Sequence, residues 1–377
     1  MMDKHLHVIS FNIPYPPNYG GIIDVYYKIK SLHALGVKVI LHCFEYERPH
    51  AQELAQLCEK VYYYKRKTGL KTNMSLLPYN VLSRKSPALL ANLLKDNFPI
   101  LFEGLHTCYY LDDPRLKKRL KIYRAANIEH HYYRYLMQSG SHWIKNTFYA
   151  VEAFRFERFQ SVIKQADISL AVSLNEKEYL QKEFPQNRIE FMPCFHANEQ
   201  VNSETGQSDF ILYHGKLSVE ENERAAIYLI QQVFSKIKHP CVIAGMNPSE
   251  KLIRVASTAS NVILVANPSE EEMQRLIHKA QIHVLITFQD TGLKLKLLNS
   301  LFAGRHIVAN KMMLAGSGLD ELCSIADQPE DMIKLCNELF EKPFFEADIQ
   351  RRENKLFPTY SNLYQGELLC KMIFDHD

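Results

Sequence analysis

Several features that identify common protein classes are missing from this 377-residue chain. It has no run of about 18 apolar residues, the length that a membrane-spanning helix requires. The apolar run near its beginning is too short and too interrupted to be a signal peptide. Its eight cysteines are scattered without a C-x-x-C pair, so neither a zinc site nor a redox site is indicated. We therefore expect a cytoplasmic protein with reduced thiols.

Signatures of several enzyme classes are also missing. There is no G-x-G-x-x-G, which disfavours a nicotinamide dehydrogenase, and no Ser-His-Asp or H-E-x-x-H arrangement. No set of metal ligands is visible, so we expect no metal. The net charge of +3 gives no strong global field that would favour nucleic acid as a partner.

What the chain does contain is a regular alternation of short apolar runs with helical patterns. Strand-like runs of the first half cover residues 6–11, 38–44, 99–105, 121–127 and 167–173, and those of the second half cover 210–215, 241–245, 261–266, 282–288 and 306–310. Helical patterns lie between them, for example at 24–35 and at 142–165. This order predicts an α/β protein with two doubly wound parallel sheets.

Residues 186–209 begin with a short strand, which is followed by a polar stretch without helical or strand periodicity, as is typical of a linker. It divides the chain into a first domain over 1–190 and a second over 191–350. Two such domains with one cleft between them are the simplest assembly.

Three loops at predicted strand ends are suited to an anion. Gly20 and Gly21 open the first helix in PYPPNYGG (14–21), where backbone N–H groups can approach a phosphate or a sugar. Lys216 follows the first strand of the second domain. In TGLKLKLLNSLFAG (291–304), Gly292, Lys296 and Asn299 share a helical face, and Lys294 lies in the first turn. The alternatives are a tight turn for the glycine pair and a solvated helix for the lysines.

Histidine is the natural general base near neutral pH. His106 follows the strand at 99–105, and His130 and His131 follow the strand at 121–127, so all three are candidates for the cleft. The alternative for each is a surface or hydrogen-bonded core position, since the chain has 16 histidines.

The span 60–90 is basic, without an acidic residue, and is interleaved with tyrosines and leucines. It is a candidate for peripheral contact with an anionic membrane, and a solvated basic face is the alternative. RLKKRLKIYR (115–124) adds a second basic cluster.

Over most of its length the chain resembles the family 4 glycosyltransferases. The segments P-x-P-x-x-x-G-G, ADISLAVSLNEKEYL (166–180), HGKLSVEEN and CVIAG occur in that family's order. The block GLKLKLLNSLFAGRHIVAN is the most specific, because it resembles the G-x-K-x-K variant of the donor site. The resemblance implies the GT-B fold, in which two Rossmann-like domains face a cleft, with a C-terminal helix over 351–377 returning to the N-terminal domain.

The resemblance also implies roles for individual residues. Gly20 and Gly21 would lie beside the donor phosphates, and Lys216 would replace an arginine. Lys294 and Lys296 would hold the diphosphate, with Gly292 letting the helix amino-terminus approach it. Two further expectations concern the histidines and the carboxylates. His106, or failing that His130, would contact the transferred sugar, whereas Thr291 and Asn299 occupy the two positions of the family's E-x7-E glutamates, so both carboxylates are missing.

We therefore expect a glycosyltransferase that moves a sugar from a nucleotide-diphosphate donor to a cell-envelope polysaccharide or lipid-linked glycan. The resemblance implies that the configuration at the transferred sugar is retained. The nucleotide sugar is a substrate, and no cofactor is expected. The expected location is the cytoplasm, at the inner face of the membrane where the basic span makes contact. The alternatives are a catalytically silent nucleotide-binding or scaffold protein, which the missing carboxylates favour, and a nucleotide-sugar epimerase.

Overall fold

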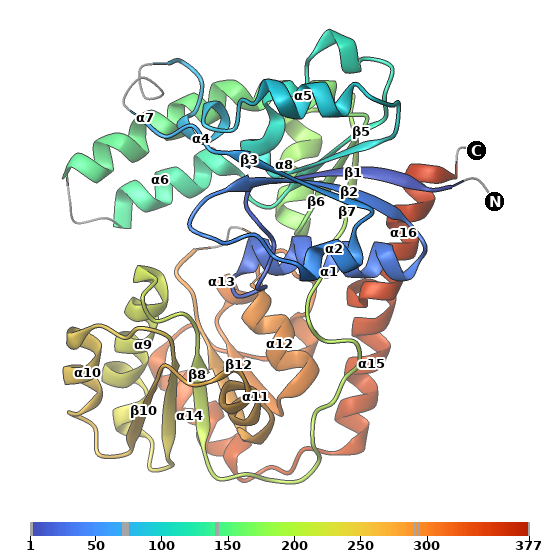
Figure 1. Ribbon diagram of the computed structural model, residues 1–377. Helices are drawn as coiled ribbons and strands as arrows, with labels where there is room; N and C mark the ends of the chain where they lie inside the picture. The colour runs from blue at the N-terminus through green and yellow to red at the C-terminus, as the bar shows by residue number, and fades with distance from the viewer. Residues whose placement is uncertain (1–2, 70–74, 140–142, 290–291, 293, 376–377) are drawn as a thin grey trace. The chain divides into compact units, whose positions relative to one another are not determined.

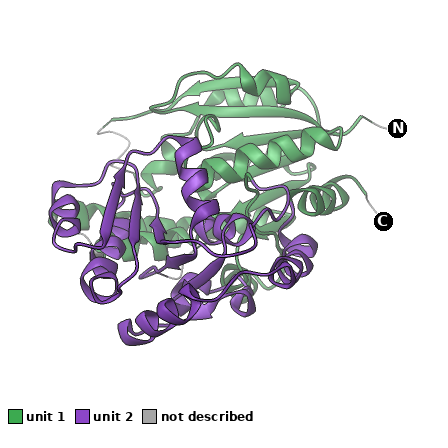
Figure 2. Cartoon of the chain, turned by 90° about the horizontal axis from the view of Figure 1, so that it is seen from below, with its two compact units in different colours: residues 1–197, 291–293, 362–377 green, residues 198–290, 294–361 purple. Residues whose placement is uncertain are grey.

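The computed structural model describes residues 3–69, 75–139, 143–289, 292 and 294–375 (Figure 1). The chain forms two compact units (Figure 2). Unit 1 comprises residues 1–197, 291–293 and 362–377, and unit 2 comprises residues 198–290 and 294–361. Each unit contains one parallel sheet with helices on both faces, which confirms the predicted α/β class with two doubly wound sheets.

The sheet of unit 1 has seven strands in the order β3-β2-β1-β4-β5-β6-β7. Its strands are β1 His5–Ser10, β2 Lys38–Glu45, β3 Lys60–Lys65, β4 Ile100–Glu103, β5 Lys121–Ala125, β6 Ile168–Ala171 and β7 Arg188–Phe191. The central strand β1 is buried on both faces: Val8 belongs to one apolar cluster and Ile9 to the other. This alternation is why such strands read as continuous apolar runs.

Helices cover both faces of this sheet. They are α1 Gly20–Ala34, α2 Glu53–Leu57, α4 Tyr79–Leu82, α5 Pro87–Leu93, α6 Glu129–Ser139, α7 Trp143–Phe159, α8 Leu174–Glu183 and α16 Asn362–Phe374, with 3-10 turns at Leu105–Tyr110, Pro114–Leu116 and Gln160–Gln165. Helices α1, α2 and α16 pack on the Val8 face, whereas α4, α5 and α7 pack on the Ile9 face. Two layers of helix therefore enclose the sheet.

The sheet of unit 2 has six strands in the order β10-β9-β8-β11-β12-β13. Its strands are β8 Ile211–His214, β9 Cys241–Gly245, β10 Val262–Ala266, β11 Ile282–Leu285, β12 His306–Ala309 and β13 Ser324–Ile325. Its helices are α9 Glu220–Gln232, α10 Glu250–Ala256, α11 Glu270–Lys279, α12 Leu295–Ala303, α13 Lys311–Leu314, α14 Pro329–Phe340 and α15 Glu346–Tyr360, with 3-10 turns at Phe234–Lys236 and Asp320–Leu322. Helices α9, α10 and α14 cover one face, and α11 and α12 cover the other.

The end of the chain differs from the single helix expected over 351–377. It consists of α15, which belongs to unit 2, and α16, which belongs to unit 1. The chain changes unit between Ser361 and Asn362. Helix α16 packs closely on α1, where the Ser31 hydroxyl donates to the Asn362 carbonyl oxygen at 2.9 Å. A Cβ on Gly366 would approach the Ser31 Oγ to 2.3 Å, so glycine is needed for this close contact.

Two strands were not predicted, and one of them lies at the start of the basic span 60–90. Residues 60–65 form the edge strand β3 of unit 1, and residues 324–325 form the edge strand β13 of unit 2. β3 reads KVYYYK, so its tyrosines were interpreted as part of a basic surface, and β13 has only two residues. The short strand expected at the start of the 186–209 segment is β7, and the division between the units follows Ala197.

A buried ionic cluster connects α1 with β4 and β5 inside unit 1. The Lys28 ammonium group donates to both Glu103 carboxylate oxygens at 2.8 and 3.0 Å and to Asp24 at 3.2 Å. Arg124 donates to both oxygens of Asp24 at 3.1 and 3.3 Å. All four side chains are at most 5% exposed. Two positive and two negative charges therefore balance one another away from solvent.

A second buried charge stabilises unit 2. Arg352 of α15 is 3% exposed and donates to the Ser203 hydroxyl at 2.9 Å and to the Leu301 carbonyl oxygen at 3.1 Å. It also donates to the carbonyl oxygens of Gly304 and Arg305. These carbonyls lie at the end of α12, where the helix dipole is negative, so the guanidinium group supplies both hydrogen bonds and the complementary charge.

No helix among the described residues is both long enough and apolar enough to cross a lipid bilayer.

We expect Glu103→Gln to lower the free energy of unfolding of unit 1 by about 3–5 kcal/mol, because Lys28 would lose a buried counter-charge. Urea denaturation followed by tryptophan fluorescence and circular dichroism measures this change. The control is Glu157→Gln, whose half-exposed carboxylate pairs with Arg134 at 2.7 Å and should cost less than about 1 kcal/mol. Equal effects of the two substitutions would contradict the importance of the buried cluster.

Candidate functional site

The carboxyl ends of parallel strands are where open α/β sheets bind ligands, and in unit 2 this edge collects lysine side chains. Lys216 lies two residues after the end of β8 and is exposed, without an ion pair to any described residue. Lys296 lies in the first turn of α12, which follows β11. Asn222 connects the two lysines: its Nδ2 donates to the Lys216 carbonyl oxygen at 3.1 Å, and its Oδ1 accepts from the Lys296 Nζ at 2.8 Å.

Lys296 is held against the sheet rather than extended into solvent. Its ammonium group lies 5.2 Å from the centre of the Tyr213 ring. Burial lowers the pKa of Lys296 to about 8, while Glu221 opposes this shift and Lys294 adds to it. Taking a cation out of water destabilises the charged form, and an anion at this position would restore it. The structure thus contains a partly desolvated ammonium group at the edge where a phosphate is predicted.

The other residues predicted on this segment have different surroundings. Lys294 is the residue that precedes the first turn of α12, and it is half-buried. Asn299 accepts a hydrogen bond from Asn198 at 3.2 Å, so its amide oxygen has a partner within unit 2. Thr291 lies outside the described residues.

Gly292 is assigned to unit 1, and its contacts differ from those predicted for it. Its φ angle is 64°, in the region that favours glycine, and its N–H donates to the Glu176 carboxylate at 2.7 Å. A Cβ at this position would lie 2.7 Å from the Asn127 Oδ1. Glycine is therefore required by the backbone and by neighbouring protein atoms.

Glu221 is a residue of this edge that the sequence did not single out. It lies in the first turn of α9 and accepts hydrogen bonds from the Thr287 hydroxyl and the Gln289 amide. Thr287 and Gln289 follow β11, whereas Glu221 follows β8. The carboxyl edge of the unit 2 sheet thus contains a carboxylate as well as lysines.

In unit 1 the glycine pair begins α1, as predicted, at the carboxyl end of β1. Gly20 is exposed and is the first residue of the helix. A Cβ on Gly21 would lie 2.8 Å from the edge of the Phe11 ring. The missing side chain at Gly21 therefore makes room for an aromatic ring of the protein itself.

His106 lies beside a buried carboxyl group at the same edge of unit 1. Its Nε2 is 3.5 Å from the Glu129 Oε2, and its ring meets the Phe156 ring edge-on at 5.3 Å. His106 is 21% exposed, so one side of the ring is accessible. Burial, together with Arg84 and Arg66, lowers its pKa well below the usual value, and the imidazole is neutral at pH 7.

Glu129 was not predicted either, and it is the more unusual member of this pair. The first residue of α6, it is 5% exposed, and burial raises its pKa to about 8, although Arg84 favours the charged form. At neutral pH the pair therefore holds one proton, which resides mainly on the carboxyl group. A proton-holding pair at a strand edge can donate to or accept from a bound hydroxyl group.

His130 occupies a more enclosed position than His106. It is 3% exposed, its ring packs on His131 at 4.3 Å, and its Nε2 is 3.4 Å from the Tyr179 hydroxyl. Burial lowers the pKa of His130 to about 4. The structure does not bring His130 to His106, although Glu129 is adjacent to it in the sequence.

The cluster at 115–124 differs from the basic surface expected there. Arg119, Lys121 and Arg124 are at most 5% exposed and bond to protein atoms. Only Arg115, Lys117 and Lys118 remain at the surface. The basic residues in and near β5 thus form hydrogen bonds in the interior of unit 1.

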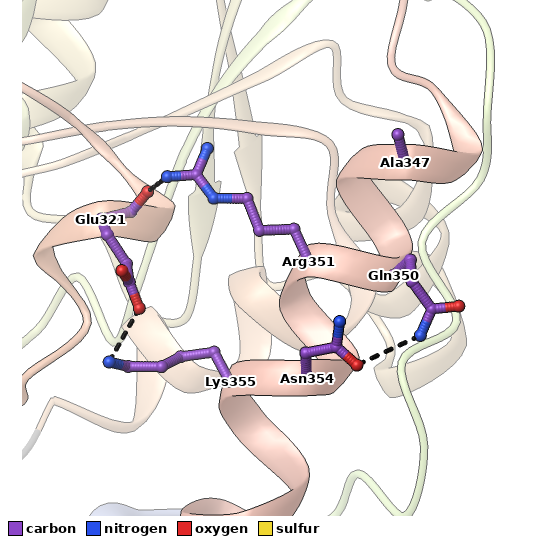
Figure 3. Close-up of a pocket in the computed structure, with 6 residues that line it drawn as sticks. All are labelled: Glu321, Ala347, Gln350, Arg351, Asn354 and Lys355. Atoms are coloured by element: carbon purple, nitrogen blue, oxygen red, sulfur yellow. Dashed lines mark hydrogen bonds and ion pairs between the residues drawn. The ribbon is translucent and has the colours of Figure 1, made fainter.

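One hollow of about 450 Å³ lies on unit 2 (Figure 3). It is formed by α15 and by the 3-10 turn that precedes β13, so it belongs to the opposite edge of the sheet from the lysines. The charged groups around it already bond to each other: Lys355 pairs with the Glu321 carboxylate at 2.7 Å, and Arg351 donates to the Glu321 carbonyl oxygen. The hollow therefore differs from the carboxyl edge of the sheet, where Lys216 has no ion pair with a described residue.

Comparisons with known proteins give consistent results. Residues 208–342, most of unit 2, match the family of glycosyl transferases group 1. A Klebsiella pneumoniae sequence, "Uncharacterized 44.6 kDa protein in cps region", is 25% identical over 338 residues, covering 82% of this chain and 84% of that protein.

Solved glycosyltransferases share the fold of the whole chain at low sequence identity. They include S. aureus TarM in complex with fondaparinux, alpha-GlcNAc-glycerol and UDP (TM-score 0.68, 9% identity, 98% of this chain and 100% of that chain). WaaG, a glycosyltransferase involved in lipopolysaccharide biosynthesis, matches with a TM-score of 0.65, 13% identity and coverage of 98% and 100%. Sucrose-phosphate synthase of Thermosynechococcus elongatus matches with a TM-score of 0.60, 15% identity and coverage of 98% and 95%. The fold common to these structures is the GT-B fold.

The raised pKa of Glu129 predicts that the free energy of unfolding depends on pH. Between about pH 4.5 and about pH 8 the folded protein keeps the Glu129 proton, whereas the unfolded chain has lost it. The free energy of unfolding should therefore fall as pH rises through this range, by up to roughly 1.4 kcal/mol per pH unit from this group. Glu129→Gln imitates the protonated form, so it should remove this slope and be more stable than the native protein at pH 8.

Urea denaturation at several pH values from 5 to 8 measures the difference between native protein and variant. Glu190→Gln is the control, since that carboxylate is partly exposed and pairs with Arg188. If native protein and Glu129→Gln showed the same dependence on pH, the raised pKa would be wrong.

Proposed function

We propose that this chain is a glycosyltransferase that moves a sugar from a nucleotide-diphosphate donor to a cell-envelope polysaccharide or lipid-linked glycan. The match of residues 208–342 to the family of glycosyl transferases group 1, together with the GT-B fold, supports this proposal. The observation that carries the proposal is the pair Lys216 and Lys296, joined through Asn222 at the carboxyl edge of unit 2. This edge lies within the residues that match the family.

In the proposed complex, the donor diphosphate binds Lys216, Lys294 and Lys296. Lys296 is prepared for this role because it is partly desolvated and has only an amide oxygen as its hydrogen-bond acceptor in the described structure. Asn299 would offer its amide to the donor ribose in place of the glutamate, and the Asn198 contact limits its movement. Thr291 and Gly292 complete the set of predicted donor-binding residues.

The reaction that we propose breaks the bond between the sugar C1 and the phosphate oxygen and forms a bond from C1 to the acceptor oxygen. The electron pair of the broken bond leaves with the nucleoside diphosphate, where Lys294 and Lys296 stabilise the growing negative charge. The acceptor hydroxyl loses its proton to the departing phosphate. We infer retention of configuration from the family resemblance.

Unit 1 would bind the acceptor, with the N–H groups at Gly20 and Gly21 beside the donor phosphates. His106 is the favoured residue for contact with the transferred sugar, because its neutral ring is 21% exposed. His130 is the second choice, since it is almost completely buried.

The relatives support the choice of acceptor class. The Klebsiella pneumoniae relative is described as a protein in the cps region, and WaaG as an enzyme of lipopolysaccharide biosynthesis. TarM was crystallised with UDP, which is a nucleoside diphosphate. We propose by analogy that this chain uses a nucleotide sugar and builds a surface glycan.

A screen of nucleotide sugars tests the proposal. Purified protein should release nucleoside diphosphate from one donor, slowly in water and faster with the acceptor glycan. Formation of a different nucleotide sugar would support an epimerase, and tight binding without any release would support the silent alternative. Either of these two results would contradict the proposed transfer.

A double variant tests the proposed donor site. Lys294→Ala combined with Lys296→Ala should weaken UDP binding by about tenfold or more, because each charge-assisted phosphate contact contributes about 1.5–3 kcal/mol. Lys311→Ala is the control, since this exposed lysine of unit 2 pairs with Asp327. Isothermal titration calorimetry gives the affinities, and an unchanged value for the double variant would refute the role of these lysines.

The same titration should depend on pH through Lys296. Its pKa of about 8 means that the free protein loses this positive charge as pH rises from 7 to 9. UDP affinity should therefore decrease over this interval in the native protein and decrease less in Lys296→Met.

We further propose that unit 1 contacts an anionic membrane surface through the basic span 60–90 and the outer face of α7. In the span, Lys60, Lys65, Lys67 and Lys85 are exposed. The outer face of α7 carries Trp143, Ile144, Phe148, Val151 and Phe154, all of them exposed. Apolar side chains beside lysines fit the interface of a bilayer that contains anionic lipid.

Vesicle sedimentation tests this contact. Native protein should sediment with vesicles that contain phosphatidylglycerol and not with pure phosphatidylcholine. Lys65→Glu combined with Lys67→Glu should release it, whereas Lys164→Glu combined with Lys182→Glu, at exposed positions of the same unit, should not. Absence of native binding to either vesicle would reject the membrane contact.

A further inference from the structure

Two arginines of unit 1, Arg66 and Arg84, carry positive charges that no carboxylate among the described residues pairs with. Their hydrogen bonds go to neutral acceptors instead. Arg66 donates from Nε to the Ser83 hydroxyl at 2.9 Å, and Arg84 donates from Nε to the Phe11 carbonyl oxygen at 2.9 Å. Arg84 is only 6% exposed, so its charge is largely desolvated. Buried charges without a counter-charge are costly and uncommon in folded proteins.

A single residue of α4 holds the two guanidinium groups together. Asn80 accepts from the Arg66 Nη2 at 2.5 Å through its side chain, and from the Arg84 Nη1 at 2.7 Å through its carbonyl oxygen. The Asn80 amide in turn donates to the Tyr133 hydroxyl at 2.7 Å. Asn80 therefore fixes two like charges near each other, although they repel.

Further contacts orient Arg66. Its guanidinium carbon lies 4.4 Å from the centre of the Tyr46 ring and 5.5 Å from that of Tyr79. Such contacts restrict the side chain without neutralising its charge. The two arginines thus form a fixed arrangement rather than two mobile surface chains.

The neighbouring titratable groups do not supply the missing negative charge. Glu129 interacts with Arg84, but burial raises its pKa to about 8, so it is protonated at neutral pH. His106 is neutral, and Tyr19 and Tyr133 have pKa values above their usual range. Burial and the repulsion from Arg66 lower the pKa of Arg84 to about 9, which an anion would reverse.

One nitrogen of each guanidinium group remains available. Among the described residues, neither the Arg84 Nη2 nor the Arg66 Nη1 has a hydrogen-bond acceptor. These donors belong to the carboxyl edge of the unit 1 sheet, since Phe11 follows β1 and both Glu129 and His106 follow neighbouring strands. Guanidinium groups are well suited to phosphate oxygens, which accept several N–H donors at once.

We propose that Arg66 and Arg84 bind a phosphate or diphosphate group of the acceptor, so that the acceptor of this enzyme is a phosphorylated molecule. This inference rests on the proposed function, because it assigns the site to the acceptor of that reaction. It adds a second anion site, in unit 1, to the donor site in unit 2. The phosphate can be carried by a lipid or by a sugar.

Calorimetric titrations with three probes test the proposal. Farnesyl diphosphate represents a lipid phosphate, glucose 6-phosphate represents a sugar phosphate, and farnesol lacks the anion. Native protein should bind one of the two phosphates and should bind farnesol at least about tenfold more weakly than farnesyl diphosphate if the lipid is the carrier. Binding of neither phosphate would overturn the inference.

Variants assign the binding to these arginines. Arg66→Gln should weaken binding of the preferred phosphate by about tenfold, and Arg84→Lys should weaken it because a point charge cannot replace the fork of donors. Arg115→Gln is the matched control, since this exposed arginine pairs with Asp113. Arg66 is only half-buried, so its variant keeps the test valid if Arg84→Lys does not fold.

UDP titrations separate this proposal from the proposed function. Arg66→Gln should leave UDP affinity unchanged, and the Lys294 and Lys296 double variant should leave the phosphate probes unchanged. Loss of UDP binding in Arg66→Gln would assign the arginines to the donor and overturn the acceptor site. If native protein bound a phosphate probe through Arg66 but never bound UDP, the proposed donor would be wrong and the anion site would stand.

Discussion

The buried guanidinium group of Arg352 fixes the end of helix α12, and the position of the candidate donor site depends on that helix. Its donors occupy the carbonyl oxygens of Leu301, Gly304 and Arg305, which would otherwise be without partners in the interior. Burial lowers the pKa of Arg352 to about 10, so it stays charged at neutral pH and complements the negative end of the helix dipole. The helix has only nine residues. Because it is so short, fixing its last turn also fixes the first turn, which carries Lys296.

The charges that complement the helix dipole therefore differ between the two ends of α12. The C-terminal end obtains its cation from within the protein, and the N-terminal end carries lysines that oppose the dipole unless an anion is present. Unit 1 shows a similar contrast. The charges of its four-residue cluster around Asp24 balance one another. Arg66 and Arg84, which both donate hydrogen bonds to Asn80, have no carboxylate partner among the described residues. In both units, cations that have no ion pair with a described residue lie at the carboxyl edge of the sheet, where ligands bind in open α/β folds. They are Lys216 and Lys296 in unit 2 and Arg66 and Arg84 in unit 1.

The sequence was sufficient for the fold class and for most strands, because buried parallel strands appear as apolar runs between helical patterns. It was insufficient for the edge strands β3, whose tyrosines lie between lysines of the basic span, and β13, which has only two residues. It predicted that Lys216 and Lys296 follow strands, because β8 and β11 are apolar runs. It could not reveal Glu129, Glu221 or the two arginines, because their chemistry comes from partners distant in the sequence. Arg84, for example, looked like part of a basic surface, yet it bonds to Phe11 and to Asn80.

The placement of α16 has a consequence for how the chain folds during synthesis. This helix supplies Leu369, Cys370 and Ile373 to the core that α1 forms with the sheet of unit 1, although the whole of unit 2 is translated between them. Until α16 has been synthesised, Ile29 and Leu32 lack part of their apolar cover. Unit 2 has nearly all of its sequence available earlier. Domains usually mature in the order of their synthesis, whereas here the N-terminal unit can finish folding only after the whole of unit 2 has been translated.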